Sequence, residues 1–142
     1  MPLVKIETRE GRTAEAKRAL LNAVHDALVE AFEIPEDDRQ QRILEYPADN
    51  FETPPGKSAD HLVITIDAFP GRSARAKREL YAGIVRRLGD LGVDPLDVLI
   101  ILNERQRLLA ILDRIRVMAT FRQGVAAFGQ RKCQVCFALL RL

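Results

Sequence analysis

The sequence predicts an α/β (α+β) fold: tandem β-α-β repeats forming a four-stranded sheet with two helices on one face, plus a C-terminal helix. The first reason is an internal repeat, because GRTAEAKRAL at 11–20 recurs as GRSARAKREL at 71–80, an offset of 60 residues. The second is the alternation of apolar and polar residues ahead of each copy, LVKIE at 3–7 and VITID at 63–67. Such alternation is typical of half-buried strands, so each unit begins with a strand that leads into a helix.

The helix of each unit is predicted by apolar residues that recur at spacings of three and four. Thr13 and Ser73 stand just ahead of these helices, where a side-chain hydroxyl can accept a hydrogen bond from an otherwise unpaired backbone N–H. The apolar positions are Leu20, Leu21, Val24, Leu28 and Phe32 in the first unit, and Leu80, Ile84, Val85, Leu88 and Leu91 in the second.

Each predicted helix ends in a turn that contains proline, EIPEDD at 33–38 and GVDPLD at 92–97. A second strand follows each turn, and it is clearest as VLIIL at 98–102. Strand-helix-strand crossovers pair their strands in parallel and in a right-handed sense. Between the units, residues 46–60 carry three prolines and a glycine, which predicts a loop with at most a short strand or turn.

These elements define one domain over residues 2–104, made of two β-α-β repeats at about 2–45 and 61–104. If both helices cover one face of the sheet, apolar residues on the other face need a partner. We therefore expect the chain to form an oligomer that closes as a ring.

The composition changes near Glu104, and residues 105–142 are predicted to be a basic, partly helical tail. Residues 1–104 carry 14 Lys and Arg against 19 Asp and Glu, a net charge of −5, whereas residues 105–142 carry 8 against 1, a net charge of +7. An apolar stripe predicts a helix at 105–123 that packs on the sheet or on a neighbouring subunit. A membrane-surface or nucleic-acid role is the weaker interpretation, because no aromatic platform or binding motif accompanies the charge. A third interpretation is a change of reading frame after Glu104, which would explain the abrupt change in composition.

The overall composition, 47% hydrophobic and 30% charged, is ordinary for a globular domain. No run of about 18 apolar residues is present, and the N-terminal stretch is acidic rather than a signal peptide, so we expect a cytoplasmic protein. Cys133 and Cys136 form a CQVC motif that would suit a redox pair or half of a zinc site. Because the histidines, His25 and His61, lie far upstream, two reduced thiols and no metal are expected.

Pro2 is the main candidate for chemistry, although it could also be an incidental chain end. Removal of Met1 is permitted by the small side chain of proline, and it would leave a free secondary amine at the start of the first strand. Burial in an apolar pocket and nearby arginines both disfavour the cationic amine and lower its pKa. Phe69 would supply part of the apolar wall, and Arg72 and Arg12 would supply the positive field and the grip on a carboxylate. Pro2 would then be a general base that needs no cofactor.

Together these features resemble the tautomerase superfamily: Pro2 at the start of a strand, a Gly-Arg-Thr/Ser motif ahead of each helix, and tandem units of 60 residues. More narrowly, AVHDALVEAFEIPEDDR at 23–39 is similar to the malonate semialdehyde decarboxylase group. The resemblance covers residues 2 to about 104. It implies a homotrimer of double units that uses the N-terminal proline as base, acid or both. It also implies a small carboxylate substrate, no cofactor, and no nucleic-acid or membrane partner.

The resemblance implies roles for individual residues. Pro2 matches the catalytic proline, and Asp38, in DDR, resembles the aspartate that positions or polarises the reacting group. Arg72, in FPGRS, resembles the arginine that binds the substrate carboxylate. Arg12, in EGRT, matches the substrate-binding arginine of the single-unit tautomerases. His25 occupies a position where related dehalogenases place a substrate-binding histidine.

Each role has a structural alternative, and two departures from the family pattern matter. His25 lies within a helix and suits a packing role, Asp38 lies in an acidic turn, and either arginine could simply solvate a helix start. Phe69 stands where the decarboxylases place a second arginine, so the substrate-binding wall differs there. In addition, NE at 103–104 runs directly into RQRLLAILDRIRVMATF, where the family continues with a glycine-rich segment that carries an aromatic residue.

The sequence therefore predicts a cofactor-independent keto-enol tautomerase for a small 2-keto or enol carboxylic acid, with Pro2 as base and acid and Arg72 on the carboxylate. The enzymatic alternative is a lyase or hydratase like malonate semialdehyde decarboxylase; Asp38 favours it and Phe69 weakens it. A third reading is an inactive oligomeric scaffold whose tail mediates association. An uncleaved Met1 would favour that reading, because the blocked amine is no longer a base.

Overall fold

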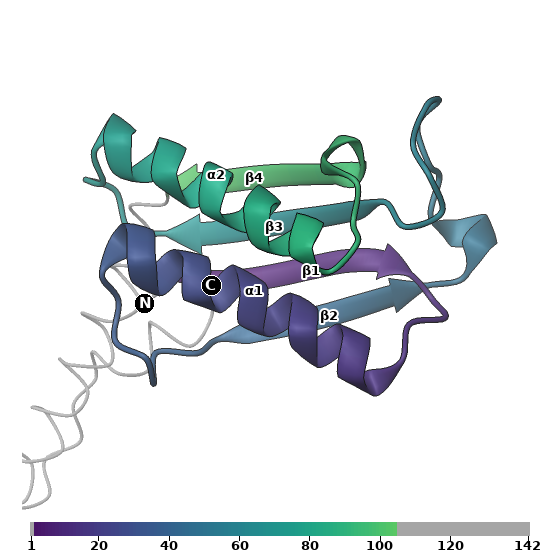
Figure 1. Cartoon of the computed structure of the whole chain (residues 1–142), viewed down its shortest axis with the longest axis horizontal. Coiled ribbons are helices and arrows are strands. Elements are labelled where there is room, and N and C mark those ends of the chain that lie inside the picture. Colours follow the sequence, from purple (N-terminus) through teal and green to yellow (C-terminus); the bar gives the residue numbers. More distant parts are fainter. Residues whose placement is uncertain (1, 105–142) are drawn as a thin grey trace, which may run out of the picture. The chain divides into compact units, whose positions relative to one another are not determined.

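A computed structural model of the chain describes residues 2–104. Over this range the order of elements is β1 (Leu3–Arg9), α1 (Ala14–Phe32), β2 (Gln41–Tyr46), β3 (Leu62–Ala68), α2 (Ala74–Asp90) and β4 (Val98–Glu104). The two β-α-β units expected from the repeat are therefore present (Figure 1). The predicted C-terminal helix, the basic tail and the CQVC motif lie outside the described residues.

The four strands form one mixed sheet in the order β2-β1-β3-β4. Within each unit the two strands are parallel, as the crossover rule predicts: β1 pairs with β2, and β3 with β4. The units join through β1 and β3, which run antiparallel in the middle of the sheet with Ile6 opposite Ile64. The start of β1 therefore lies beside the end of β3.

Both helices lie on the same face of the sheet (Figure 1). Each begins at its predicted hydroxyl: Thr13 Oγ1 accepts a hydrogen bond from the Ala16 N–H at 3.2 Å, and Ser73 Oγ accepts one from the Ala76 N–H at 3.1 Å. The glycine of each repeated motif has a positive φ, 119° at Gly11 and 109° at Gly71. This left-handed conformation turns the chain from strand to helix, and it favours residues without a Cβ.

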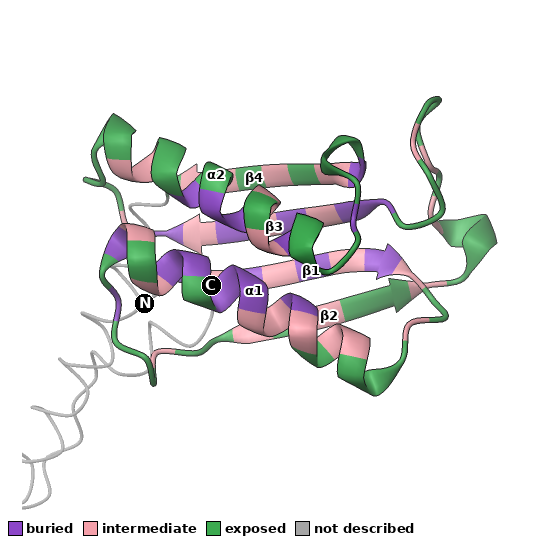
Figure 2. Ribbon diagram, viewed as in Figure 1, coloured by how far each residue is buried: buried purple, intermediate pink, exposed green. Residues whose placement is uncertain are grey.

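The core lies between the helices and the covered face of the sheet (Figure 2). Alternate residues of β1 and β3 point into it, and the apolar stripes of α1 and α2 meet them, as the periodicities predict. Leu91 is the exception, because α2 ends at Asp90 and leaves this side chain 46% exposed. Each large apolar side chain buried there contributes about 1.5–3 kcal/mol. The side chains with less than 2% exposure include Ile6, Leu20, Leu28, Leu62, Ile64, Ile66, Leu80, Ile84 and Leu88.

The internal symmetry extends to an ion pair in each unit. Lys17 Nζ lies 2.8 Å from Glu45 Oε2, and Lys77 Nζ lies 2.7 Å from Glu104 Oε2. In both cases a lysine in the first turns of the helix reaches the end of the second strand. The pair thus connects helix and sheet at the same place in both units.

The segment between the units is a loop with one 3-10 turn, Ala48–Asn50. Its last part is tied to a second 3-10 turn, Pro95–Asp97, through the buried carboxylate of Asp97. Asp97 accepts hydrogen bonds from the backbone N–H of Ser58 at 2.7 Å and from the Ser58 hydroxyl, while His61 Nδ1 donates to the Asp97 carbonyl at 2.8 Å. The linker is therefore fastened to the second unit just before β3 begins.

The second face of the sheet carries no helix within residues 2–104 (Figure 1). Leu44, Leu99 and Ile101 are 39%, 47% and 39% exposed on alternate positions of the outer strands. Polar groups are interspersed: Tyr46 donates to Glu7 at 2.9 Å, and Asn103 Nδ2 donates to Asp67 at 3.1 Å. We call this the open face; it combines exposed apolar side chains with paired polar groups.

Candidate active site

Pro2 is buried at the start of β1. Continuing the antiparallel register by one residue places it opposite Ala68, the last residue of β3, because Leu3 pairs with Asp67. On its other side the Val4 N–H donates to the Gln40 carbonyl at 2.9 Å, so the segment that leads into β2 runs alongside. Pro2 thus lies between two chain segments at one end of the sheet, which we call the Pro2 end.

Phe69 and Arg72 follow the end of β3 and lie at the Pro2 end. Phe69 is half-buried, and the guanidinium carbon of Arg72 lies 5.1 Å from the centre of the Phe32 ring, a cation–π contact. A shallow depression of about 310 Å³ surrounds Arg72, lined by the last residues of α1 and the first of α2. Arg72 is exposed, lines this depression, and forms no ion pair with a carboxylate of residues 2–104.

Asp38 reaches the same end from the turn between α1 and β2. Its backbone N–H donates to the Pro35 carbonyl at 3.1 Å, and its side chain is partly buried. Because Gln40 is bonded to Val4, the turn lies beside the start of β1. The fold therefore gathers Pro2, Phe69, Arg72 and Asp38 at the Pro2 end, although they are far apart in the sequence.

His25 lies inside α1 and is 1% exposed. Its Nε2 donates a hydrogen bond of 3.0 Å to the Glu36 carbonyl, which belongs to the turn that carries Asp38. Burial and this bond give His25 the geometry of a residue that anchors the turn, the structural alternative considered for it. Among residues 2–104, the side chain of His25 is too deeply buried to contact a substrate directly.

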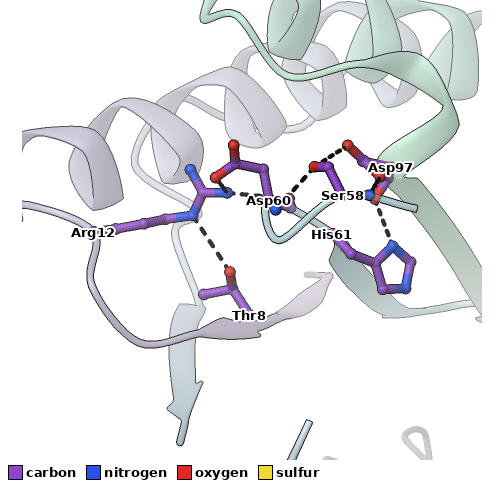
Figure 3. A network of polar contacts seen from close by, with 6 residues as sticks. All are labelled: Thr8, Arg12, Ser58, Asp60, His61 and Asp97. Carbon is purple, nitrogen blue, oxygen red and sulfur yellow. Dashed lines mark hydrogen bonds and ion pairs between the residues drawn. The ribbon is translucent and has the colours of Figure 1, made fainter. Parts of the chain in front are cut away.

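Arg12 comes shortly after the last residue of β1 and therefore lies at the end of the sheet opposite Pro2; Figure 3 shows its contacts. A strand of seven residues at about 3.3 Å per residue separates it from Pro2 by roughly 23 Å. Arg12 Nε donates to Thr8 Oγ1 at 3.3 Å, and its Nη2 donates to both the carbonyl and the carboxylate of Asp60 at 3.1 and 3.0 Å. A second depression, of about 370 Å³, lies beside this pair. Within one chain, Arg12 is therefore not part of the group around Pro2.

The polar groups at the Arg12 end have shifted pKa values with clear causes. The two hydrogen bonds from Ser58 hold the pKa of Asp97 below its ordinary value of 3.8, against the opposing effect of burial. A hydrogen bond from Lys17 likewise lowers the pKa of Glu45, which also faces the backbone N–H and the charge of Arg12. Both carboxylates are therefore ionised at neutral pH.

Sequence reasoning missed three residues at the Arg12 end: Thr8, Asp60 and Asp97. The signal for Thr8 was present in the repeat, because its counterpart at the offset of 60 is Ala68, which cannot hold an arginine. Asp60 and Asp97 belong to segments that only the folded chain brings together. Among residues 2–104 there is no group of three or more His, Cys, Asp or Glu placed to hold a metal ion, and no helix long and apolar enough to cross a membrane.

Comparisons of the sequence with protein families and with curated proteins all find tautomerases. A family model described as tautomerase enzyme matches residues 2–55, and a second model with the same description matches residues 38–108. Two curated relatives come from Bacillus subtilis (strain 168). The probable tautomerase YusQ is 32% identical over 112 residues, 75% of this chain and 88% of the relative, and the probable tautomerase YrdN is 28% identical over 109 residues, 73% and 84%.

Solved structures show the same fold. FG41 malonate semialdehyde decarboxylase inhibited by 3-bromopropiolate has a TM-score of 0.68 and 31% identity, and the match covers 72% of this chain and 82% of that one. A fused 4-OT that forms a symmetric trimer has a TM-score of 0.64 and 27% identity, covering 72% and 85%. The similarity thus extends over most of each of these proteins.

Proposed function

This chain belongs to the tautomerase family, and from that premise we propose that it interconverts the keto and enol forms of a small 2-oxo carboxylic acid. The observation that carries the proposal is the position of Pro2, buried at the start of β1 and beside the segments that bear Phe69, Arg72 and Asp38. The group combines a candidate amine, a cation for a carboxylate and an apolar wall. These are the elements that proton transfer next to a carbonyl requires.

Pro2 is the proposed general base and acid. Removal of Met1 leaves a secondary amine, whose cation is disfavoured by burial and by the nearby guanidinium of Arg72. The neutral amine accepts the proton of the enol hydroxyl, and the resulting ammonium returns a proton to the neighbouring carbon. The reaction shifts one double bond and leaves the amine unchanged, so no redox partner is consumed.

Arg72 is the proposed binding group for the substrate carboxylate. Its guanidinium lies against the ring of Phe32 and lines a depression, and it is exposed among residues 2–104, so it can donate to a carboxylate in a bidentate manner. Phe69, half-buried between Ala68 and the start of α2, supplies part of the apolar wall. Asp38 is proposed to polarise the reacting group from the opposite side of Pro2.

A second candidate function is decarboxylation of a 3-oxo acid, with hydration of an unsaturated acid as its relative. The similarity of 31% to a malonate semialdehyde decarboxylase and the position of Asp38 near Pro2 favour it. Phe69 argues against it, because an arginine stands there in the decarboxylase pattern. Pro2, Arg72 and Asp38 would serve either reaction, and a measurement on both substrates separates them.

We also propose that the active form is a homotrimer in the cytoplasm. The fused 4-OT that resembles this chain forms a symmetric trimer, and the open face offers apolar side chains to a partner. An inactive scaffold, the third reading of the sequence, would share this assembly. It differs only in the absence of turnover.

The test is ketonisation of phenylenolpyruvate, followed by ultraviolet absorbance, with the N-terminal residue of each preparation identified by mass spectrometry. The wild-type chain that begins at Pro2 should accelerate ketonisation, and Pro2→Ala should reduce the rate at least a hundredfold. Pro54→Ala, an exposed linker proline, is the matched control and should retain the full rate. A Pro2→Ala protein as active as wild type would reject the proposal.

The same proteins should be incubated with malonate semialdehyde while carbon dioxide release is measured. Tautomerase function predicts that phenylenolpyruvate is the far better substrate. Faster turnover of malonate semialdehyde, also dependent on Pro2, would assign the decarboxylase reaction instead. If a chain with a free Pro2 turns over neither substrate, the scaffold reading replaces both.

A further inference from the structure

The repeat permits a comparison of two arginines that occupy equivalent positions. Arg12 and Arg72 both follow a glycine with positive φ and both precede the hydroxyl that begins a helix. Each lies beside a shallow depression, of about 370 Å³ for Arg12 and 310 Å³ for Arg72. Local backbone geometry therefore gives both arginines the same opportunity to bind an anion.

Their side-chain environments differ. The Arg12 side chain is only 16% exposed, and it donates hydrogen bonds to protein groups. Its Nε donates to Thr8 Oγ1, and its Nη2 donates to the carbonyl and the carboxylate of Asp60 (Figure 3). The Asp60 side chain is 68% exposed, and its carboxylate lies 3.0 Å from Arg12 Nη2. The carboxylate of a small molecule would have to displace it to reach the same donor.

Arg72 lacks both of these contacts within residues 2–104. Ala68 stands at the position equivalent to Thr8, so no hydroxyl receives the Arg72 Nε from there. No carboxylate of the described residues pairs with Arg72, and the ring of Phe32 supports its guanidinium from one side only. The carboxylates that line its depression include Glu30, which is paired with Arg87 at 2.6 Å, and Glu79, which is paired with Arg75 at 2.7 Å.

We infer that Asp60 is an internal carboxylate that occupies the anion-binding arginine of the first repeat, and that Arg72 is consequently the arginine of the repeated motif that takes a small carboxylate. The inference rests on the proposed function for the class of ligand, a 2-oxo carboxylate. It adds a specificity residue, Asp60, which lies on the linker and outside the group around Pro2. Glu45, which is paired with Lys17 at 2.8 Å, makes a smaller contribution to the negative potential near Arg12.

The inference predicts how many carboxylates each chain binds. Pyruvate is the probe, titrated into the full-length protein by isothermal calorimetry. Wild type should bind one pyruvate per chain, and Arg72→Gln should weaken that binding at least tenfold. Asp60→Asn should bind a second pyruvate, which the double variant Asp60→Asn with Arg12→Gln should lose.

Asp26→Asn is the matched control, because Asp26 is an exposed aspartate on α1 that lies away from both arginines. It should leave the number of sites at one. Thermal melting of each variant establishes that it is folded; Asp60→Ser serves as a second variant in case the asparagine at 60 lowers the yield. Failure of both folded Asp60 variants to add a site, or loss of the wild-type site in Arg12→Gln, would overturn the inference.

Failure of the proposed function has a different signature. Binding is measured without turnover, so an inactive protein in which Asp60→Asn still adds a site would retain the inference about Asp60 and reject the catalytic role of Pro2. If turnover depends on Pro2 but the Asp60 variants gain no site, the catalytic role of Pro2 is retained and the inference about Asp60 is rejected.

Discussion

At the scale of single residues, the two ends of the sheet place different demands on their side chains. Within residues 2–104, Arg72 at the Pro2 end is exposed, stacks on Phe32 and forms no ion pair, whereas Arg12 is held by Thr8 and Asp60. An arginine that is already oriented but not paired can bind a carboxylate without first breaking an ion pair. The effect of a substitution should therefore be on binding at Arg72 and on stability at Arg12.

Arg72→Gln should raise the KM for phenylenolpyruvate about tenfold or more, with a smaller change in kcat, because the arginine holds a group that does not react. Arg72→Lys should fall between wild type and Arg72→Gln, since lysine keeps the charge but not the planar pair of donors. Steady-state kinetics at several substrate concentrations separate the two constants. A large fall in kcat at unchanged KM would instead place Arg72 at the reacting atoms.

Asp97 gives a prediction about pH. Because its pKa is lowered from 3.8 in the folded chain, the carboxylate stabilises the fold above that pH, and the contribution is lost as the pH falls through the lowered value. Asp97→Asn should lower the melting temperature by several degrees at pH 7. The difference from wild type should shrink below pH 4. Asp90→Asn, on an exposed aspartate, is the control, and equal shifts in both variants at every pH would contradict the role given to Asp97.

At the scale of elements, the helix starts are the features that the sequence predicted best. The position of Thr13 and Ser73 ahead of an apolar stripe predicts both as caps, and both accept the expected hydrogen bond. Local chemistry decides such a cap, so a local reading of the chain suffices. The alternation at 3–7 and 63–67 identifies β1 and β3 for the same reason, although the strands are longer, Leu3–Arg9 and Leu62–Ala68, because pairing between strands extends them.

Thr13→Ala and Ser73→Ala should each lower the free energy of unfolding by about 1 kcal/mol, because each leaves one helix N–H without its partner. The two losses should add in the double variant, since the caps lie on different helices and share no contact. Urea denaturation measures all four proteins. Thr13→Asn, which restores an acceptor, should recover most of the loss, and failure to do so would show that the hydroxyl acts through another contact.

At the scale of the whole molecule, the sequence predicted two units and one sheet but not how the units join. The repeat defines β1-α1-β2 and β3-α2-β4, whereas the antiparallel pairing of β1 with β3 depends on contacts between residues about 60 apart. That pairing brings Arg72 to Pro2 and leaves Arg12 at the other end. The sequence predicts both arginines near Pro2. Within one chain Arg12 does not lie there, because the length of β1 separates it from Pro2.

The open face leads to a prediction about assembly. If it forms the contact between subunits, the native protein should have a mass of three chains of 16.0 kDa in sedimentation velocity. Leu99→Glu with Ile101→Glu places two charges on that face and should shift the protein to smaller species. Arg18→Glu, on an exposed part of α1, is the control for added negative charge. A trimer that withstands the double substitution would require a different interface.

The antiparallel junction of the two units also has a consequence for the chemistry that the duplication can support. A pseudo-twofold axis between β1 and β3 relates two similar ends, yet a chain has only one amino terminus, so the duplicated unit supplies two arginines for a single amine. An alkylating analogue of the substrate should therefore add its mass once per chain and no more. Because no amine lies at the Arg12 end, linker residues such as Asp60 and Ser58 can occupy it. Substitutions at the Arg12 end should therefore affect the stability of the protein rather than its turnover.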